Sequence, residues 1–365
     1  MLTISNNNML LRNFGYNGGT WATDLMDLNP QNLVVGKNAV GKSMTIRRIA
    51  EVADVISGRK SVEDVDVLAV YAIVLKHDEN TEFIYEFGWT GSEVSVELLK
   101  VYDLTTHIYT TLIDRTPERT ILDGEVINPP NNNLVIHTRR DVIKYPYIET
   151  LISWASNVEG LYFNVLEFDG DLKMGARMQS DGINLYAMVK SLNEDSIRNV
   201  IEMANRVGYE LTEIEPVELG TLKGVLFTES GVVLPMFCSE LSKGMFRTLY
   251  LLIYMEYMTH NQMPSTLLID DLCEGLDYER STKLGKLVFE YCEKNNIQLI
   301  ASSNDSFLMD VVDLKYWNIL QRDETKVVAI NKTNNPELFE NFKFTGLSNF
   351  DLFSSDFINR HKADK

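Results

Sequence analysis

The sequence predicts an α/β fold with a mixed sheet, an N-terminal antiparallel meander and an inserted helical lobe. Three observations predict it. An apolar strand, a glycine-rich loop and a helix follow one another over residues 32–57, and β-rich segments fill residues 66–114. From residue 244 onward, strands alternate with helices. Alternation of this kind indicates parallel strands, whereas short β-rich segments separated by turns indicate antiparallel ones.

The N-terminal elements follow from local patterns. Residues 9–16 (MLLRNFGY) read as an opening strand, and residues 32–36 (NLVVG) as a buried strand. Residues 42–57 carry apolar side chains at helical spacing. Between residues 66 and 114, the turns HDEN and TGSE separate three β-rich segments, which predicts the meander.

Helical periodicity returns in residues 145–158 and 182–208, after the loop NPPNNN, and predicts a lobe of roughly 80 residues. Strand-like segments follow at 210–219 and 222–236, and then a helix, strand, helix and strand end at residue 303. We expect four parts: residues 1–135 and 215–335 form the two halves of one head, 136–214 the lobe, and 336–365 a tail. The apolar anchors of this tail (Phe344, Phe350, Phe353 and Phe357) would dock on a partner or on the head itself.

Composition excludes several classes of protein. The 365 residues are 45% hydrophobic and 24% charged, with no apolar run long enough for a membrane helix. The N-terminus has no secretory signal, and the three cysteines show no metal-ligand spacing, so we expect reduced thiols and a cytoplasmic protein. A net charge of −18 disfavours a chain that coats nucleic acid. Residues 137–144 (HTRRDVIK) would form either a local basic groove or a solvated charged turn.

The loop GKNAVGKS, Gly36 to Ser43, fits the Walker A pattern in full. Glycines let backbone N–H groups turn toward phosphate oxygens, and the following helix N-terminus adds positive potential. Lys42 is expected to reach the β- and γ-phosphates of ATP, and Ser43 to bind Mg²⁺. The expected nucleotide-binding residues here are Gly36, Lys37, Asn38, Ala39, Val40, Gly41, Lys42, Ser43 and Met44.

A second motif, STLLIDDLCEGLD at residues 265–277, ends an apolar strand in two acids. Asp270 is placed to hold the Mg²⁺ shell, and Asp271 to orient and deprotonate water. A third motif, CSELSKGMFRTLYLL at residues 238–252, puts Ser242 and Gly244 at the start of a long helix.

Together these motifs resemble those of ABC-type P-loop ATPase heads of the SMC, RecF and OLD class. LSKGMFRTL resembles their LSxGxxR signature, and LIDDLCEGLD resembles their Walker B and D-loop, which makes Asp277 the D-loop acid. RNF at residues 12–14 matches their opening strand. The resemblance covers residues 1–115 and 215–335. It implies a homodimer or higher oligomer that closes around two Mg-ATP, with Ser242 and Gly244 capping the γ-phosphate held by a second chain.

The chain departs from the family pattern at three places. Asp271 stands where the family has Glu, and Asn304 replaces the switch histidine. The glutamine expected before the meander is missing, and His77, Asp78 or Asn80 would fill its role. We therefore expect slow or partner-gated hydrolysis, with Asp271, Asn304 and Lys42 as the catalytic residues. Tyr16 and Trp21 would either stack on adenine or pack within the N-terminal sheet.

The resemblance leaves three functions open. The first is a sensor that regulates a separately encoded effector, a nuclease or toxin, as in bacterial anti-phage defence. The second is a RecF-like DNA-repair ATPase, and the third is a nucleotide-dependent scaffold that does not hydrolyse ATP. A transport ATPase is disfavoured because it needs a membrane partner, and a kinase because it leaves the LSKG helix unexplained.

Overall fold

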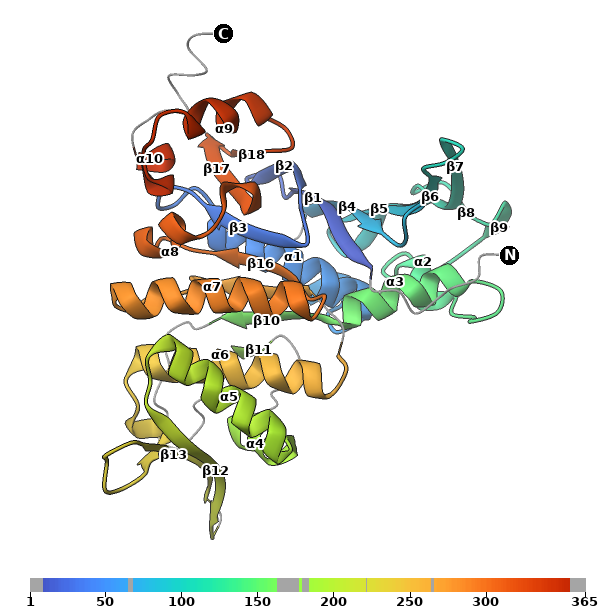
Figure 1. Ribbon diagram of the computed structural model, residues 1–365. Helices are drawn as coiled ribbons and strands as arrows, with labels where there is room; N and C mark the ends of the chain where they lie inside the picture. The colour runs from blue at the N-terminus through green and yellow to red at the C-terminus, as the bar shows by residue number, and fades with distance from the viewer. Residues whose placement is uncertain are drawn as a thin grey trace. The chain divides into compact units, whose positions relative to one another are not determined.

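A computed structural model describes residues 9–64, 68–162, 177–178, 184–220, 222–263 and 266–354 (Figure 1). The chain packs into two compact units. Unit 1 comprises Met1–Val158 and Lys315–Phe339, and unit 2 comprises Glu159–Leu314 and Glu340–Lys365. The four-part division by motifs stays a prediction, and the last eleven residues of the predicted tail lie outside the described residues.

Unit 1 contains a large mixed sheet. Its strands lie in the order β3-β17-β18-β2-β1-β4-β5-β6-β7-β8-β9, with β3–β17 and β18–β2 parallel and the other neighbouring pairs antiparallel. The strands are β1 Leu10–Asn17, β2 Ala22–Asp27, β3 Gln31–Val35, β4 Leu68–Lys76, β5 Thr81–Thr90, β6 Glu93–Asp103, β7 Ile108–Arg115, β8 Thr120–Leu122, β9 Glu125–Ile127, β17 Trp317–Asp323 and β18 Lys326–Asn331. A mixed sheet is thus confirmed.

The meander over residues 66–114 is confirmed as antiparallel. β4 pairs with β5 in continuous register from Leu68↔Thr90 to Lys76↔Glu82. Every second residue of β4 is buried, which is the period of a strand with one face on a core. Buried aromatic rings fill that face, with the Tyr85 and Phe87 centroids 4.9 Å apart. Burial of such rings supplies most of the driving force for this packing.

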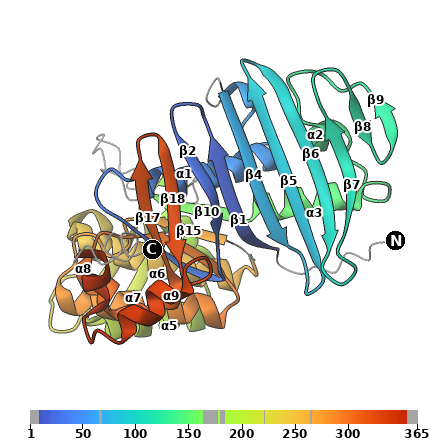
Figure 2. The same ribbon diagram turned by 90° about the horizontal axis from the view of Figure 1, so that it is seen from above.

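Three helices belong wholly to unit 1: α1 Lys42–Ser57, α2 Val135–Thr138 and α3 Pro146–Ser156. The α1 bounds are those expected from the apolar spacing. In α3, proline occupies the first turn, where its missing N–H costs no hydrogen bond. Figure 2 shows α1 and α3 along one face of the meander.

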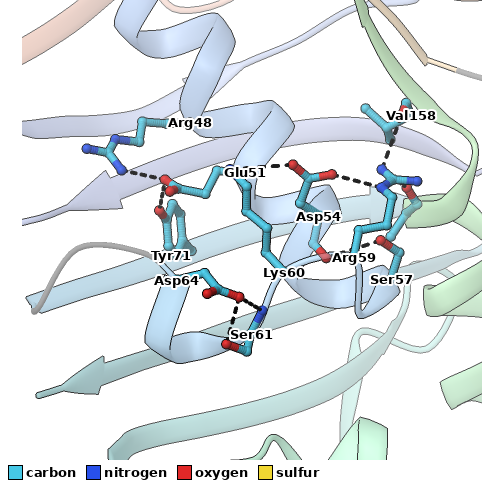
Figure 3. A network of polar contacts seen from close by, with 11 residues as sticks. Arg48, Glu51, Asp54, Ser57, Arg59, Lys60, Ser61, Asp64, Tyr71 and Val158 are labelled. Atoms are coloured by element: carbon cyan, nitrogen blue, oxygen red, sulfur yellow. Dashed lines mark hydrogen bonds and ion pairs between the residues drawn. The ribbon is translucent and has the colours of Figure 1, made fainter. Parts of the chain in front are cut away.

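A polar network fixes α1 against its neighbours (Figure 3). Glu51 of α1 accepts hydrogen bonds from Tyr71 of β4 at 2.5 Å and from Arg48. Near the C-terminal end of α1, the buried Asp54 holds Arg59 at 2.8 Å. Arg59 in turn donates to the carbonyls of Ala155, Ser156 and Val158. The helix that follows the glycine-rich loop is therefore anchored to β4 and to the end of α3.

Unit 2 combines two groups of strands with a cluster of helices. Its strands lie in the order β11-β10-β15-β16, with β15 and β16 parallel, and β12-β13-β14 form a separate antiparallel sheet. The strands are β10 Val158–Tyr162, β11 Arg177–Met178, β12 Leu211–Leu219, β13 Leu222–Glu229, β14 Met236–Phe237, β15 Thr266–Asp270 and β16 Gln298–Ser302. The helices are α4 Leu185–Ser191, α5 Glu194–Val207, α6 Lys243–His260, α7 Tyr278–Lys294, α8 Ser306–Val311 and α10 Asn349–Ser354, while α9 Pro336–Lys343 contains a boundary between the units.

One feature departs from the sequence expectation. The helix expected over residues 145–158 ends at Ser156, and the chain continues as the buried strand β10. Hence the interval 136–214 is not wholly helical. A five-residue apolar strand directly after an apolar helix leaves the helical pattern unbroken, so periodicity alone could not separate the two.

The described helices include none long and apolar enough to cross a membrane. All three cysteines are buried and unpaired, as expected. Burial raises the pKa of the Cys273 and Cys292 thiols to about 12, which keeps both protonated and unreactive.

Candidate functional site

Unit 1 contains the glycine-rich loop that is predicted to bind phosphate. The buried strand β3 leads into Gly36, and α1 begins at Lys42. A Cβ on Gly36 would lie 2.7 Å from Val40 Cγ2 and 3.0 Å from the carbonyl oxygen of Leu320, so glycine allows this close approach. Ala39 and Gly41 have left-handed φ angles of 63° and 109°, which bend the backbone back on itself.

Lys42 lies across this loop. Its side chain is buried, and its Nζ donates to the carbonyl oxygens of Gly36 at 2.7 Å and Lys37 at 3.2 Å. Lys37, Asn38 and Ala39 are exposed along the loop. The ammonium group thus lies inside the ring of backbone that would surround a phosphate.

The start of α1 suits an anion. Its N-cap is Gly41, which offers no side-chain oxygen, and its first turn holds no acidic residue. N–H groups at a helix start attract negative charge through the helix dipole. Ser43 is half-buried and Met44 exposed in this first turn. These features fit a polyphosphate.

Trp21 and Arg322 flank the loop, whereas Tyr16 does not take part. Tyr16 is buried, and its ring centroid lies 5.0 Å from that of Tyr71. Of the two expected roles, this placement matches packing within the N-terminal sheet. The ring of Trp21 packs against Gly41, where a Cβ would approach it to 2.1 Å. Arg322 lies over the Trp21 ring at 4.6 Å and donates to the carbonyl oxygen of Ala39. Sequence reasoning missed Arg322 because no motif includes it and 279 residues separate it from Ser43 in the chain.

Unit 2 contributes a pair of acids at the end of β15. Asp270 is buried, and its Oδ1 accepts a hydrogen bond of 2.7 Å from Ser302 Oγ. Among the described residues, its Oδ2 has no hydrogen-bond donor. Asp271 is half-buried, and its φ of 57° is left-handed. This conformation turns the chain sharply away from the strand.

The predicted signature residues Ser242 and Gly244 lie beside residues 274–276, the predicted D-loop segment, in unit 2. Ser242 is exposed and caps α6 by accepting from the Met245 N–H at 3.2 Å. A Cβ on Gly244 would lie 3.1 Å from the carbonyl oxygen of Gly275, so glycine allows this close approach. Arg247, one turn further along α6, pairs with Glu274 at 2.6 Å. The signature helix and the segment 274–276 are therefore held together.

Asp277 and Asn304 complete the predicted set. Asp277 caps α7 through the Arg280 N–H, and that hydrogen bond lowers the pKa of its carboxyl group. Asn304 is exposed in the loop after β16. Its neighbour Asp305 caps α8 and accepts a 2.6 Å hydrogen bond from Ser281 of α7. The switch loop and the D-loop helix are thus directly linked.

The residues expected to replace the missing glutamine occupy the turn between β4 and β5. His77 is buried edge-on against Phe83, with ring centroids 5.6 Å apart, whereas Asp78 and Asn80 share a tight turn. His77 therefore has a packing role, and the turn predicted from HDEN is confirmed.

Basic residues of the 137–144 segment are largely paired within unit 1. His137 is turned toward the carbonyl oxygen of Ile56 at 3.1 Å, and burial lowers the pKa of its ring. Arg140 binds Glu149, and Lys144 binds Glu125. This pairing matches the charged turn rather than a basic groove.

The carboxylates of Asp270 and Asp271 in unit 2 supply some of the oxygen ligands that a divalent cation needs. The described residues contain no cluster of three His, Cys, Asp or Glu side chains able to hold a metal. Mg²⁺ differs from other cations in needing few protein ligands, since waters and substrate phosphates supply the rest. One buried carboxylate with an oxygen that lacks a donor is what such an ion requires.

The sequence matches no family model, and it matches no curated protein. Solved structures do match. One is an SMC head bound to the C-winged helix domain of ScpA, with a TM-score of 0.53 and 12% identity over 90% of this chain and 99% of that chain. Another is an SMC head with an extended coiled coil, bound to the C-terminal domain of ScpA derived from Pyrococcus furiosus. It has a TM-score of 0.51 and 12% identity over 92% of this chain and all of that one.

The chain has the fold of an SMC head domain. The ABC-type head expected from the three motifs is thereby confirmed at the level of fold. At 12% identity the likeness extends no further than the fold.

Proposed function

We propose that this SMC-like head binds Mg-ATP and hydrolyses it slowly within a homodimer. Gly36–Ser43 would hold the phosphates, with Lys42 exchanging its two carbonyl partners for phosphate oxygens. Ser43 and Asp270 would hold Mg²⁺, which supplies positive charge to the transferring phosphoryl group. Asp271 would orient and deprotonate the attacking water, and Asn304 would hydrogen-bond water or phosphate without carrying a proton.

The observation that carries this proposal is the arrangement of unit 2. The residues predicted to form the signature, Walker B and D-loop lie in one patch, where Arg247 of α6 pairs with Glu274 and the Glu274 N–H donates to the Asp271 carbonyl oxygen. In this patch Ser242 and Asn304 are exposed. A helix start presented in this way, with no acidic side chain in its first turn, suits the phosphate of a second chain.

We further propose that the dimer regulates a separately encoded effector protein, in the manner of anti-phage defence systems. The support is the net charge of −18 and the ion pairs of Arg140 and Lys144 within the 137–144 segment, both of which favour a protein partner over nucleic acid. The SMC heads of the two solved structures described above are bound to a protein, ScpA. Co-purification with the products of adjacent genes tests this: a nuclease or toxin supports it, and DNA-stimulated hydrolysis would favour the RecF-like alternative.

Light scattering with and without Mg-ATP tests the dimer. The unchanged protein should double its mass on nucleotide addition, and Lys42→Ala should not, because it lacks the ammonium group that binds phosphate. Lys294→Ala, a change of an exposed lysine at the C-terminal end of α7 and outside every predicted motif, is the control and should still dimerise. If the mass of the unchanged protein is the same with and without Mg-ATP, the proposal is contradicted.

A further inference from the structure

A buried hydroxyl group lies between the two acids at the end of β15. Ser302 ends β16, which runs parallel to β15 with Ile269 paired to Ala301. Asp270 and Ser302 occupy the next step of this register. Neighbouring residues of paired strands project to the same face of a sheet. The topology itself therefore brings the Ser302 hydroxyl to the Asp270 carboxylate.

The hydrogen bonds of Ser302 define how this carboxylate lies. Ser302 Oγ donates to Asp270 Oδ1 at 2.7 Å and accepts from the Asp271 N–H at 3.0 Å. A serine hydroxyl has a single proton. Since the backbone N–H supplies its own proton, that of Ser302 goes to Asp270. One carboxylate oxygen is thereby fixed, and Oδ2 is left to take a cation.

The same hydroxyl supports the backbone that carries Asp271. A left-handed φ is unfavourable for a residue other than glycine unless its surroundings hold it. Here the Asp271 N–H binds Ser302 Oγ, and the Leu272 N–H binds the Ser302 carbonyl oxygen at 2.8 Å. Ser302 is fully buried, which shields these bonds from bulk water.

We propose that Ser302 is a positioning residue that orients Asp270 toward a divalent cation and fixes the backbone of Asp271. This inference rests on the proposed function, because it needs a metal–nucleotide complex. Groups that hydrogen-bond a metal ligand commonly change metal affinity by about 10–100-fold when they are removed.

The test compares Ser302→Ala with Thr266→Val. Thr266 lies at the opposite end of the same strand pair, equally buried, and donates to Gln298 Oε1 at 3.1 Å. The probe is Mn²⁺, titrated by electron paramagnetic resonance in the presence of a non-hydrolysable ATP analogue. Affinity for the same analogue in EDTA is measured alongside.

Ser302→Ala should weaken Mn²⁺ binding about tenfold or more, with metal-free nucleotide affinity unchanged, and Thr266→Val should change neither. A purely structural role would lower both affinities together. If Ser302→Ala does not fold, Ser302→Cys keeps the volume with a weaker donor and should still weaken Mn²⁺ binding several-fold.

The role of Ser302 is overturned if the folded Ser302 variants bind Mn²⁺ as tightly as the unchanged protein does, or if Thr266→Val lowers the Mn²⁺ affinity equally. These results leave the proposed function standing. That role is also overturned if the unchanged protein binds the nucleotide analogue but does not bind Mn²⁺. Failure of the unchanged protein to bind nucleotide at all overturns the proposed function as well.

Discussion

Asp271 combines a catalytic assignment with a left-handed backbone. Its φ of 57° suits Asp and Asn better than most residues, because their short polar side chains tolerate this region. The departure from glutamate therefore has a local physical reason in this chain. The shorter side chain has less reach toward a water, which is consistent with slow hydrolysis.

Asp271→Asn should keep the fold and nucleotide-dependent dimerisation while lowering hydrolysis about 100-fold or more, because the amide cannot accept a proton. Single-turnover phosphate release measures the loss. Glu293→Gln removes an exposed carboxylate of the same unit and should leave hydrolysis unchanged. Equal turnover in Asp271→Asn and the unchanged protein would favour the non-hydrolysing scaffold.

Glu97 is a second residue whose environment has a measurable consequence. It is fully buried in β6, where it accepts hydrogen bonds from the Val135 and Ile136 N–H groups and from Tyr85. Burial outweighs these bonds and the nearby Arg115, and raises the Glu97 pKa to about 7. The folded chain therefore holds this proton more tightly than an unfolded chain does.

The stability contribution of Glu97 is fully present below about pH 4.5 and is lost as the pH rises through about 7. The free energy of unfolding should fall by about 3 kcal/mol across that window. Glu97→Gln stays neutral at every pH and should flatten this slope. Urea midpoints between pH 4.5 and 8 measure the slope, with Glu93→Gln at the exposed start of β6 as the control. A slope that persists in Glu97→Gln rules out Glu97 as its source.

Among the elements, α1 is the one whose surroundings matter most for the phosphate loop. Arg59 ties the region just after α1 to the last carbonyls of α3, and Asp54 holds its guanidinium group. A cation at a helix C-terminus also meets the negative end of the dipole. These contacts keep the far end of α1 in place.

Arg59→Ala should lower the free energy of unfolding by about 2 kcal/mol, because it leaves the buried Asp54 with only the longer Lys60 contact. Arg59→Lys keeps the charge without the forked donors and should lose less. Thermal melts measure both losses, and the exposed Arg47→Ala in α1 serves as the control. Equal stability of Arg59→Ala and Arg47→Ala would contradict the clamp.

Predictability from sequence differed between elements. The α1 bounds and the meander strands followed from periodicity, because each element has one buried face. Buried strands such as β10, next to an apolar helix, left no such pattern. The phosphate loop was readable because its residues are contiguous. Arg322 and Ser302 were not, because the register of distant strands places them beside their partners.

At the scale of the whole molecule, each chain carries one set of motifs. If the nucleotide is sandwiched between two chains, then each site takes its phosphate loop from one chain and its signature from the other. A chain with a defective loop can then be rescued by a chain with a defective signature. Sites formed within one chain allow no such rescue.

Mixing Lys42→Ala with Ser242→Arg distinguishes the two arrangements. Each variant alone should be inactive, one for lack of the phosphate-binding ammonium group and the other because a bulky side chain blocks the exposed start of α6. Because Lys42→Ala does not pair with itself, the dimers that form in an equal mixture are largely mixed ones. Each mixed dimer holds one intact site of two, so turnover should recover to at most about half of the unchanged value. Phosphate release against mixing ratio should peak at equal amounts. If every mixture turns over no faster than either variant alone, the shared site is contradicted, because the second chain then does not complete a site in the mixed dimer.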